Sequence, residues 1–232
     1  MSLRRFLPWR RFKRRYEVIN HLVRTRQFRD YLEIGVSTGK CMRRVECERR
    51  SGVDPNPRIE PTGWTLHEKT SDEFFSENTE RFDIVFVDGL HLAEQAFIDT
   101  INAVAVLKPN GVVLVHDTHP PTERAQLRDL SLEQYGGWNG DVWKSIAYIR
   151  RHMPDLFCRV LDLDWGIGIV APLDHDRATA RPTEMKDDVE QFVSRTSWQD
   201  LANDRAGTLG LIPNKRSLER ELASSGVCRR VR

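Results

Sequence analysis

The chain has 232 residues, 39% of them hydrophobic, which is enough for one substantial core but not for two. Its 36 Lys and Arg residues nearly balance its 34 Asp and Glu residues. The resulting formal net charge of +2 excludes a strong overall field that would favour an acidic partner.

The sequence predicts a cytoplasmic protein. No stretch approaches the roughly 18 apolar residues of a membrane span, and no long apolar segment follows the basic start as a secretory signal requires. The four cysteines form no C-x-x-C pair and no zinc-type cluster, so we expect reduced thiols that serve packing. They are Cys41, Cys47, Cys158 and Cys228.

The first 16 residues are strongly basic and contain no acidic side chain. We interpret them as a solvated terminus, with contact to phosphate or to an anionic membrane surface as the alternative. Apolar residues lie among the arginines, so a strap between the subunits of a homo-oligomer is a further alternative. The basic residues are Arg4, Arg5, Arg10, Arg11, Lys13, Arg14 and Arg15, and the apolar ones include Phe6, Leu7, Trp9 and Phe12.

Strands and helices alternate from residue 16 onward. Apolar residues at helical spacing predict a helix over 16–26, and short apolar segments predict strands over 30–34, 51–54 and 64–68. Residues 35–39 read as a tight loop and 40–45 as the start of a helix. A short helix opens near Thr70, Ser71 and Asp72, whose small polar side chains are suited to cap its free amides.

The strongest strand signal is FDIVFV at 82–87, a nearly continuous apolar run that suits a strand buried on both faces. A helix over 92–107 and a second buried strand over 111–115 follow. The irregular segment 118–140 indicates an insertion or lid over the strand ends. After a helix over 142–152, strands at 156–161 and 166–171 indicate a closing hairpin, and helices are predicted over 184–193 and 217–223.

This order predicts an α/β fold, a Rossmann-like, doubly wound, mostly parallel sheet with a closing antiparallel hairpin. We expect a basic arm and lead-in helix over 1–29, the main domain over 30–172 with its insertion at 118–140, and a polar helical extension over 173–232. Ligands of such sheets bind at the carboxyl ends of the strands. Residues 35–39, Asp54, Asp88, His91 and Asp117 all fall there.

The segment from Glu33 to Gly39 (EIGVSTG) runs from a strand end into a glycine-bounded turn. Glycine lets the backbone approach a ligand closely, and a helix start presents free N–H groups to it. The spacing is not G-x-G-x-x-G, which argues against a dehydrogenase. It resembles motif I of class I methyltransferases, matched by Glu33, Gly35 and Gly39, with Ser37 in place of a central glycine. The resemblance implies that the loop lies beneath the methionine part of S-adenosylmethionine (SAM).

Two other places fit the same family. Asp54 ends the second strand, where the family acid binds the ribose diol, and a carboxylate offers two strong acceptors for such a diol. Ser71 and Asp72 fall where the family contacts the adenine amino group. The alternatives are structural, since Asp54 before Pro55 is also a typical turn residue and Ser71 or Asp72 a typical helix cap.

Two aspartates end neighbouring strands, Asp88 in VDGLH and Asp117 in VHDTH. One crossover helix joins the two strands, so we expect the carboxylates to lie close enough to share a divalent cation. Oxygen ligands suit Mg²⁺.

These blocks narrow the resemblance. D-G-x-H at 88–91, H-D at 116–117 and WNGDVWK at 138–144 are similar to a bacterial subfamily that includes metal-dependent macrolide-sugar O-methyltransferases. Over residues 30–171 the resemblance implies that Asp88 and Asp117 bind Mg²⁺, Asp88 beside the cofactor, and that His91 is the general base. Thr118 departs from the family, which commonly has an acid or an amide there. A water, His119 or the lack of a metal are the alternatives that follow.

The implied reaction is O-methylation of a sugar, glycan precursor or natural product. A sugar hydroxyl is a poor nucleophile, so a cation that lowers its pKa and an imidazole that takes its proton complement each other. For His91, capping of the next helix is the alternative. Tyr135, Trp138 and Trp143 are candidates for the wall of the acceptor pocket. Core packing is the alternative for Trp143, in a helix that Asp141 is expected to cap.

Two other functions stay open. A nucleic-acid methyltransferase would use the arginine arm, although a basic footprint normally spreads over the domain. A non-catalytic SAM-binding module would keep the fold without turnover, which the set of Asp88, His91 and Asp117 argues against. We expect SAM and Mg²⁺ as cofactors, a small hydroxylated acceptor as the partner and no nucleic acid.

Overall fold

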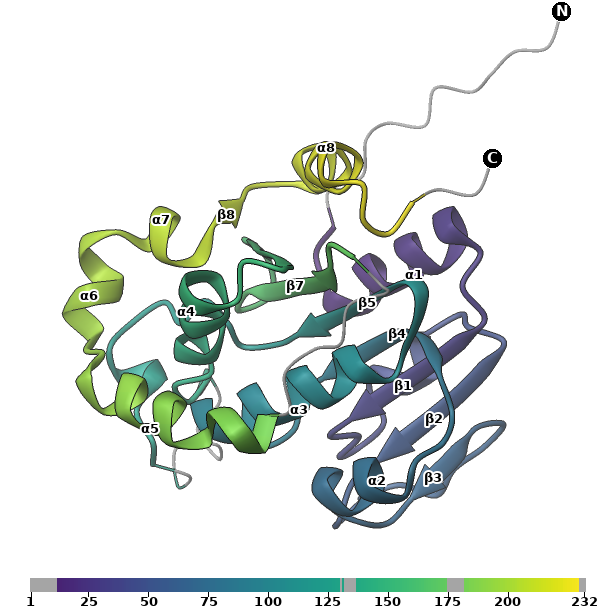
Figure 1. Ribbon diagram of the computed structural model, residues 1–232. Coiled ribbons are helices and arrows are strands. Elements are labelled where there is room, and N and C mark those ends of the chain that lie inside the picture. Colours follow the sequence, from purple (N-terminus) through teal and green to yellow (C-terminus); the bar gives the residue numbers. More distant parts are fainter. Residues whose placement is uncertain (1–11, 130, 132–136, 175–181, 230–232) are drawn as a thin grey trace, which may run out of the picture.

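The computed structural model of the chain describes residues 12–129, 131, 137–174 and 182–229. In this part of the chain, eight strands form one mixed sheet in the order β3-β2-β1-β4-β5-β7-β6-β8 (Figure 1). Strands β1 to β5 pair in parallel, β7 runs antiparallel to both β5 and β6, and β8 is parallel to β6. The predicted Rossmann-like, mostly parallel sheet with a closing hairpin is confirmed.

The elements have the following bounds. The strands are β1 (Asp30–Ile34), β2 (Arg49–Val53), β3 (Thr65–His67), β4 (Phe82–Val87), β5 (Leu107–Val115), β6 (Leu156–Leu161), β7 (Ile167–Pro172) and β8 (Leu211–Ile212). The helices are α1 (Arg15–Arg26), α2 (Ser71–Glu77), α3 (Ala93–Ala105), α4 (Trp143–His152), α5 (Lys186–Arg195), α6 (Trp198–Asn203), α7 (Arg205–Leu209) and α8 (Lys215–Ser225). Short 3-10 turns include η1 (Met42–Arg44) and η2 (Arg124–Gln126).

The predicted helix over 40–45 is wrong, because this segment contains only the 3-10 turn η1. Cys41, Met42 and Val45 are all buried there, and β2 begins four residues after Val45. An α-helix gains stability only after a costly first turn, and this short segment turns toward β2 before a second one. Strand β8 was not predicted, since two residues carry no periodicity.

The continuous apolar runs of β4 and β5 reflect a sheet that is covered on both faces. Successive side chains of a strand point to opposite faces, and here both faces are packed. One core lies under α3, α4 and α5 and contains Val85, Val87, Val113 and Val115. The other lies under α1 and α8 and contains Ile84, Phe86, Val112 and Leu114.

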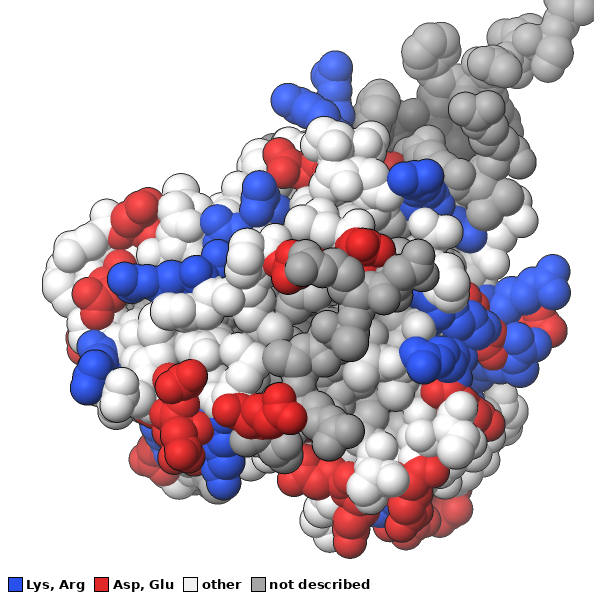
Figure 2. Space-filling model, in the orientation of Figure 1, with Lys and Arg blue, Asp and Glu red and all other residues white. Residues whose placement is uncertain are grey.

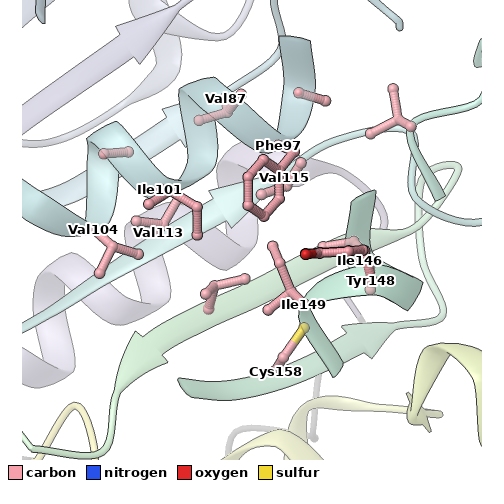
Figure 3. Packing of buried hydrophobic residues seen from close by; sticks show 14 of the residues in the cluster. Val87, Phe97, Ile101, Val104, Val113, Val115, Ile146, Tyr148, Ile149 and Cys158 are labelled. Carbon is pink, nitrogen blue, oxygen red and sulfur yellow. The ribbon is translucent and has the colours of Figure 1, made fainter. Parts of the chain in front are cut away.

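Figure 3 shows the first core, where side chains of α3 and α4 meet above the sheet. Phe97 and Tyr148 pack edge to face, with ring centroids 5.2 Å apart and an interplanar angle of 82°. Ile101 and Ile146 fill the space beside them (Figure 3). Aromatic pairs in this geometry add to the stability that burial alone provides.

The C-terminal segment is part of both cores. Strand β8 extends the sheet at β6, and α8 packs on the same face as α1 (Figure 1). Leu201 and Leu209 contribute to the first core, and Leu218 and Leu222 to the second. The polar composition of this segment therefore belongs to amphipathic helices, whose few apolar residues are buried.

The surface carries charges of both signs. Figure 2 shows Lys and Arg interspersed with Asp and Glu over the face displayed. None of the helices in the described ranges combines the length and apolar composition of a bilayer crossing. All four cysteines are buried free thiols, as predicted. Residues 1–11 of the basic arm lie outside the described residues, so the arm's roles stay predictions.

Trp143 lies at the centre of the first core with no exposed surface. We expect Trp143→Ala to lower the free energy of unfolding by about 3–5 kcal/mol, because it removes the largest buried side chain and leaves a cavity. Urea unfolding followed by circular dichroism measures the loss, and Trp143→Phe is the control with a smaller expected effect. A loss below about 1 kcal/mol for the alanine variant would contradict this core position.

Candidate active site

A cavity of about 1480 Å³ opens at the carboxyl ends of β1, β4 and β5. Sites for one small ligand usually measure about 300–1,000 Å³, so this cavity has room for two. Its wall contains nearly all the predicted site residues, namely Glu33, Gly35, Ser37, Asp54, Ser71, Asp72, Asp88, His91 and Asp117. Gly39 is the exception, because it does not line the cavity. It turns the chain at a φ of +66° and packs against Ile59.

Gly35 brings the ends of β1 and β4 into contact. Its φ is +86°, and a Cβ at this position would lie 2.0 Å from the carbonyl oxygen of Asp88. Only glycine fits such an approach. Because the 3-10 turn η1 replaces the expected helix, no α-helix N-terminus follows this loop. Ser37, with a φ of +49°, supplies the second left-handed turn of this loop.

Asp54 is both a turn residue and a link between two loops. One carboxylate oxygen accepts from the Ser37 N–H at 2.7 Å, and the other accepts from the Asn56 N–H at 2.8 Å. Each carboxylate oxygen has a second lone pair. The structural interpretation of Asp54 is therefore correct and leaves acceptors for a diol.

Thr70, which also lines the cavity, caps α2, and its neighbours do not. Ser71 and Asp72 lie in the first turn of the helix, on the cavity wall. Gln95 from α3 donates to Asp72 at 3.1 Å and to Asp99 at 3.0 Å. Asp99 is buried, and burial raises its pKa to about 6. These residues form a cluster of polar groups, of which only Ser71 and Asp72 were predicted as site residues.

Glu33 is a buried carboxyl group beneath the motif loop. Burial raises its pKa to about 8, although a hydrogen bond from the Tyr31 hydroxyl at 2.5 Å favours the ionised form. The group is thus mainly neutral at pH 7. A cation bound nearby would stabilise the ionised form of Glu33.

Asp88, His116 and Asp117 form a compact cluster at the ends of β4 and β5. The His116 Nδ1 lies 3.1 Å from Asp88 Oδ1 and 2.8 Å from Asp117 Oδ2. Its Nε2 lies 2.7 Å from the backbone carbonyl oxygen of Asp164, which only accepts, so Nε2 carries hydrogen and Nδ1 faces the carboxylates. Burial lowers the pKa of His116, but the two carboxylates outweigh it and raise it to about 10.

Further partners surround this cluster. Arg15, the first residue of α1, reaches Asp88 Oδ2 at 2.6 Å and Asp164 Oδ2 at 3.1 Å. Asn139 donates to the remaining oxygen of Asp117 at 2.7 Å. Burial opposes the charge of Asp88, yet His116 and Arg15 hold the pKa of that carboxyl well below its usual range. Every oxygen of the two carboxylates therefore has a partner.

His91 does not cap α3. The first amide of that helix, on Ala93, donates to Asp141 at 2.9 Å. Asp141 therefore caps α3, and the prediction that it caps its own helix α4 is wrong. The His91 Nε2 lies 3.3 Å from Asp117 Oδ2 and 3.6 Å from Asp88 Oδ1. Burial lowers the pKa of His91, but the hydrogen bond and charge of these carboxylates outweigh it and leave it raised. The imidazole is positioned to exchange a proton at the cavity wall.

Three aromatic residues were predicted to line the acceptor pocket, and of these Trp138 lines the cavity. Its ring centroid lies 5.0 Å from that of His91, at an interplanar angle of 31°. Trp143 is in the core instead, so its packing interpretation is correct. Tyr135 lies outside the described residues.

Five further residues of the site were not predicted. They are Arg15, His116 as a member of the cluster, Asn139, Asp164 and Trp165. A topological signal existed for two of them, because β7 is antiparallel to β5 and the turn before it must lie at the carboxyl ends of the parallel strands. Asp164 and Trp165 occupy that turn, with φ values of +47° and +69°. A non-glycine residue in this region costs on the order of 1–3 kcal/mol. Arg15 gave no signal, since it was one arginine among several.

Residues 32–118 match a family model described as a methyltransferase domain. No curated protein sequence matches the chain. The SAH-bound methyltransferase PaMTH1 from Podospora anserina has a similar structure, with a TM-score of 0.52 and 16% identity over 69% of this chain and 78% of its own. A putative O-methyltransferase from Klebsiella pneumoniae has a TM-score of 0.51 and 14% identity over 68% and 79%. At these identities the two structures share the fold.

The pKa of Asp99 predicts a pH-dependent stability. The folded protein keeps this proton up to about pH 6, whereas the unfolded chain releases it near the ordinary value of 3.8. The stability contributed by the protonated group is full below about pH 3.8 and is lost as the pH rises through 6. Asp99→Asn removes this loss. The difference in the free energy of unfolding between the variant and the wild type is expected to favour the variant by about 2–3 kcal/mol more at pH 7.5 than at pH 4. Urea unfolding at the two pH values measures it.

The control for this experiment is Asp72→Asn, which removes an exposed carboxylate from the same glutamine. Its effect is expected to be small at both pH values. An Asp99→Asn gain that does not change with pH would contradict the burial of an uncompensated carboxyl group.

Proposed function

We propose that this class I S-adenosylmethionine-dependent methyltransferase methylates a hydroxyl oxygen of a sugar, a glycan precursor or another hydroxylated natural product, with His91 as the base. The observation that carries the proposal is the position of the His91 Nε2. It lies 3.3 Å from Asp117 and 3.6 Å from Asp88, in the cavity that the motif loop also lines.

In this proposal one part of the cavity holds SAM. The loop at Gly35 and Ser37 lies beneath the methionine part, Asp54 accepts from the ribose diol, and Ser71 and Asp72 contact the adenine. The neighbouring Gln95 and Asp99 add polar groups at the adenine end. Support comes from the cavity volume and from the free lone pairs of Asp54. Glu33 adds to this, because a positive ligand stabilises its carboxylate.

A divalent cation fits the cluster of Asp88, His116 and Asp117, whose donor atoms lie within 4.8 Å of one another. The His116 Nε2–H faces a backbone carbonyl, which is the usual arrangement of a histidine that binds metal through its other nitrogen. In this proposal His116 is the third ligand of the cation, beside Asp88 and Asp117. His119 is not a ligand, because it pairs with Asp162. Two carboxylates and an imidazole suit Mn²⁺ as well as Mg²⁺. When bound, such a cation lowers the pKa of a nearby hydroxyl.

The chain's own residues then account for the proton. As the acceptor oxygen bonds to the methyl carbon, its O–H bond breaks and the proton passes to the His91 imidazole in its neutral form. The carbon–sulfur bond breaks at the same time, so the sulfonium becomes a neutral thioether. Asp88 and Asp117 stabilise the imidazolium, and the Trp138 ring restricts the orientation of the imidazole.

We also propose a cytoplasmic location. Its support is the four cysteines, which are all buried free thiols. Disulfides form and persist in oxidising compartments, whereas reduced thiols are usual in the cytosol.

Asp117→Asn tests the cation. Asparagine tolerates the left-handed backbone at this position, where φ is +58°, so the variant should fold. We expect calorimetric titration to give a wild-type affinity for Mg²⁺ or Mn²⁺ that falls at least about tenfold in the variant, with SAM affinity unchanged. Asp162→Asn, which removes a carboxylate beside His119, is the control. No metal binding by the wild type would remove the cation from the proposal, and no SAM binding would overturn the cofactor assignment.

His91→Ala tests the base. We expect turnover to fall by about 10²–10⁴-fold, because the proton loses its acceptor, while the dissociation constant of SAM stays the same. Turnover is measured as SAH release with a panel of sugars and glycosides. His119→Ala is the control and should retain nearly full turnover. Full turnover in His91→Ala would show that the base is elsewhere.

A further inference from the structure

Exposed apolar side chains gather at the mouth of the cavity, beside His91. Leu90 is 46% exposed and Trp165 is 41% exposed, and both line the cavity together with Trp138. Large hydrophobic side chains with this much exposure are few among the described residues. An apolar patch rimmed by polar groups is typical of a binding surface.

The backbone of Trp165 is unfavourable for its side chain. Its φ is +69°, a value that bulky residues rarely adopt, and it lies between two other left-handed residues, Asp164 and Gly166. The loop is tied to the end of β5, since the His119 N–H donates to the Trp165 carbonyl oxygen at 2.8 Å. A strained and exposed side chain adds little to the core. The role of Trp165 therefore lies in what its ring contacts at the cavity.

The two tryptophans come from separate loops that meet at the mouth. A Cβ on Gly137 would lie 3.4 Å from the Trp165 ring, so the loop that carries Trp138 packs directly against Trp165. The Trp138 indole N–H donates to the Leu127 carbonyl oxygen at 2.6 Å, which fixes this ring beside His91. Trp138 and Trp165 therefore line the same cavity as His91.

We propose that Trp165 and Trp138 form a clamp that selects a pyranose ring as the methyl acceptor. The clamp rests on the proposed function, and it adds the residues that recognise the part of the acceptor that does not react. A pyranose has apolar C–H faces that pack on indole rings and hydroxyls around its edge. His91, which lines the same cavity, can pair with one of these hydroxyls. A catechol also has faces, but its two hydroxyls lie on one edge.

Calorimetric binding to the SAH-loaded protein tests the clamp without turnover. The ligands are methyl pyranosides of glucose, galactose and rhamnose, with catechol and glycerol as the aromatic and acyclic probes. We expect the wild type to bind at least one pyranoside more tightly than catechol or glycerol. Trp165→Gly should weaken this binding at least about tenfold, and Trp165→Phe should retain most of it.

Stability separates a binding role from a structural one. Glycine accepts a φ of +69°, so the melting temperature of Trp165→Gly should equal or exceed that of the wild type. Gln27→Gly is the matched control. Gln27 is exposed, has a φ of +56° and does not line the cavity, so its replacement relieves the same strain and should leave pyranoside binding unchanged.

Several outcomes would overturn the clamp. These are a Trp165→Gly variant that keeps pyranoside affinity or melts well below the wild type, and a wild type that binds no pyranoside or binds catechol more tightly. Methylation of glycerol without pyranoside binding would overturn the clamp and leave the proposed O-methylation intact. Conversely, full turnover in His91→Ala together with Trp165-dependent pyranoside binding would overturn the assignment of His91 as the base and leave the clamp intact.

Discussion

The position of the half-buried Asp88 beside the buried Asp117 is the constraint around which the site is organised. Two carboxylates side by side, largely shielded from water, are stable only when cations and donors reach them. Three segments far apart in the chain supply these partners. Arg15 comes from the start of α1, His116 from the end of β5 and Asn139 from the loop before α4. Charge pairing thus ties the lead-in helix and a loop to the carboxyl ends of the central strands.

The same constraint accounts for unusual backbone conformations at the site. Neighbouring residues of a strand point to opposite faces, yet His116 and Asp117 face the same cluster. The left-handed backbone of Asp117, with a φ of +58°, turns its carboxylate back toward the His116 ring. Gly140 also has a positive φ, and a Cβ there would lie 1.8 Å from the His91 carbonyl oxygen. Local preferences are overridden where residues must converge, which is typical of functional sites.

The difference between local preferences and contacts made by distant segments explains what could be predicted from the sequence. The apolar runs of β4 and β5 gave the buried strands, and parallel topology then brought Asp88 and Asp117 to one edge of the sheet. Gly35 was predictable because a close backbone approach requires glycine. Arg15 was not, since its contact with Asp88 spans 73 positions without any periodic signal. Asp141 followed the capping rule but on a different helix, because a side chain can cap whichever helix start tertiary packing brings to it.

Charge also defines how much of the chain makes up the site. The methyltransferase-domain match covers residues 32–118 and includes the motif loop, Asp88, His91 and Asp117. Arg15 precedes it, and Asn139, Asp164 and Trp165 follow it, yet the first three complete the polar contacts of the cluster and the fourth borders the mouth. The matched segment alone would leave Asp88 without its guanidinium partner and His116 without its carbonyl. Removing one member of a buried pair costs more than the pair contributes, so the lead-in helix and the hairpin turn belong to the same functional unit as the central strands.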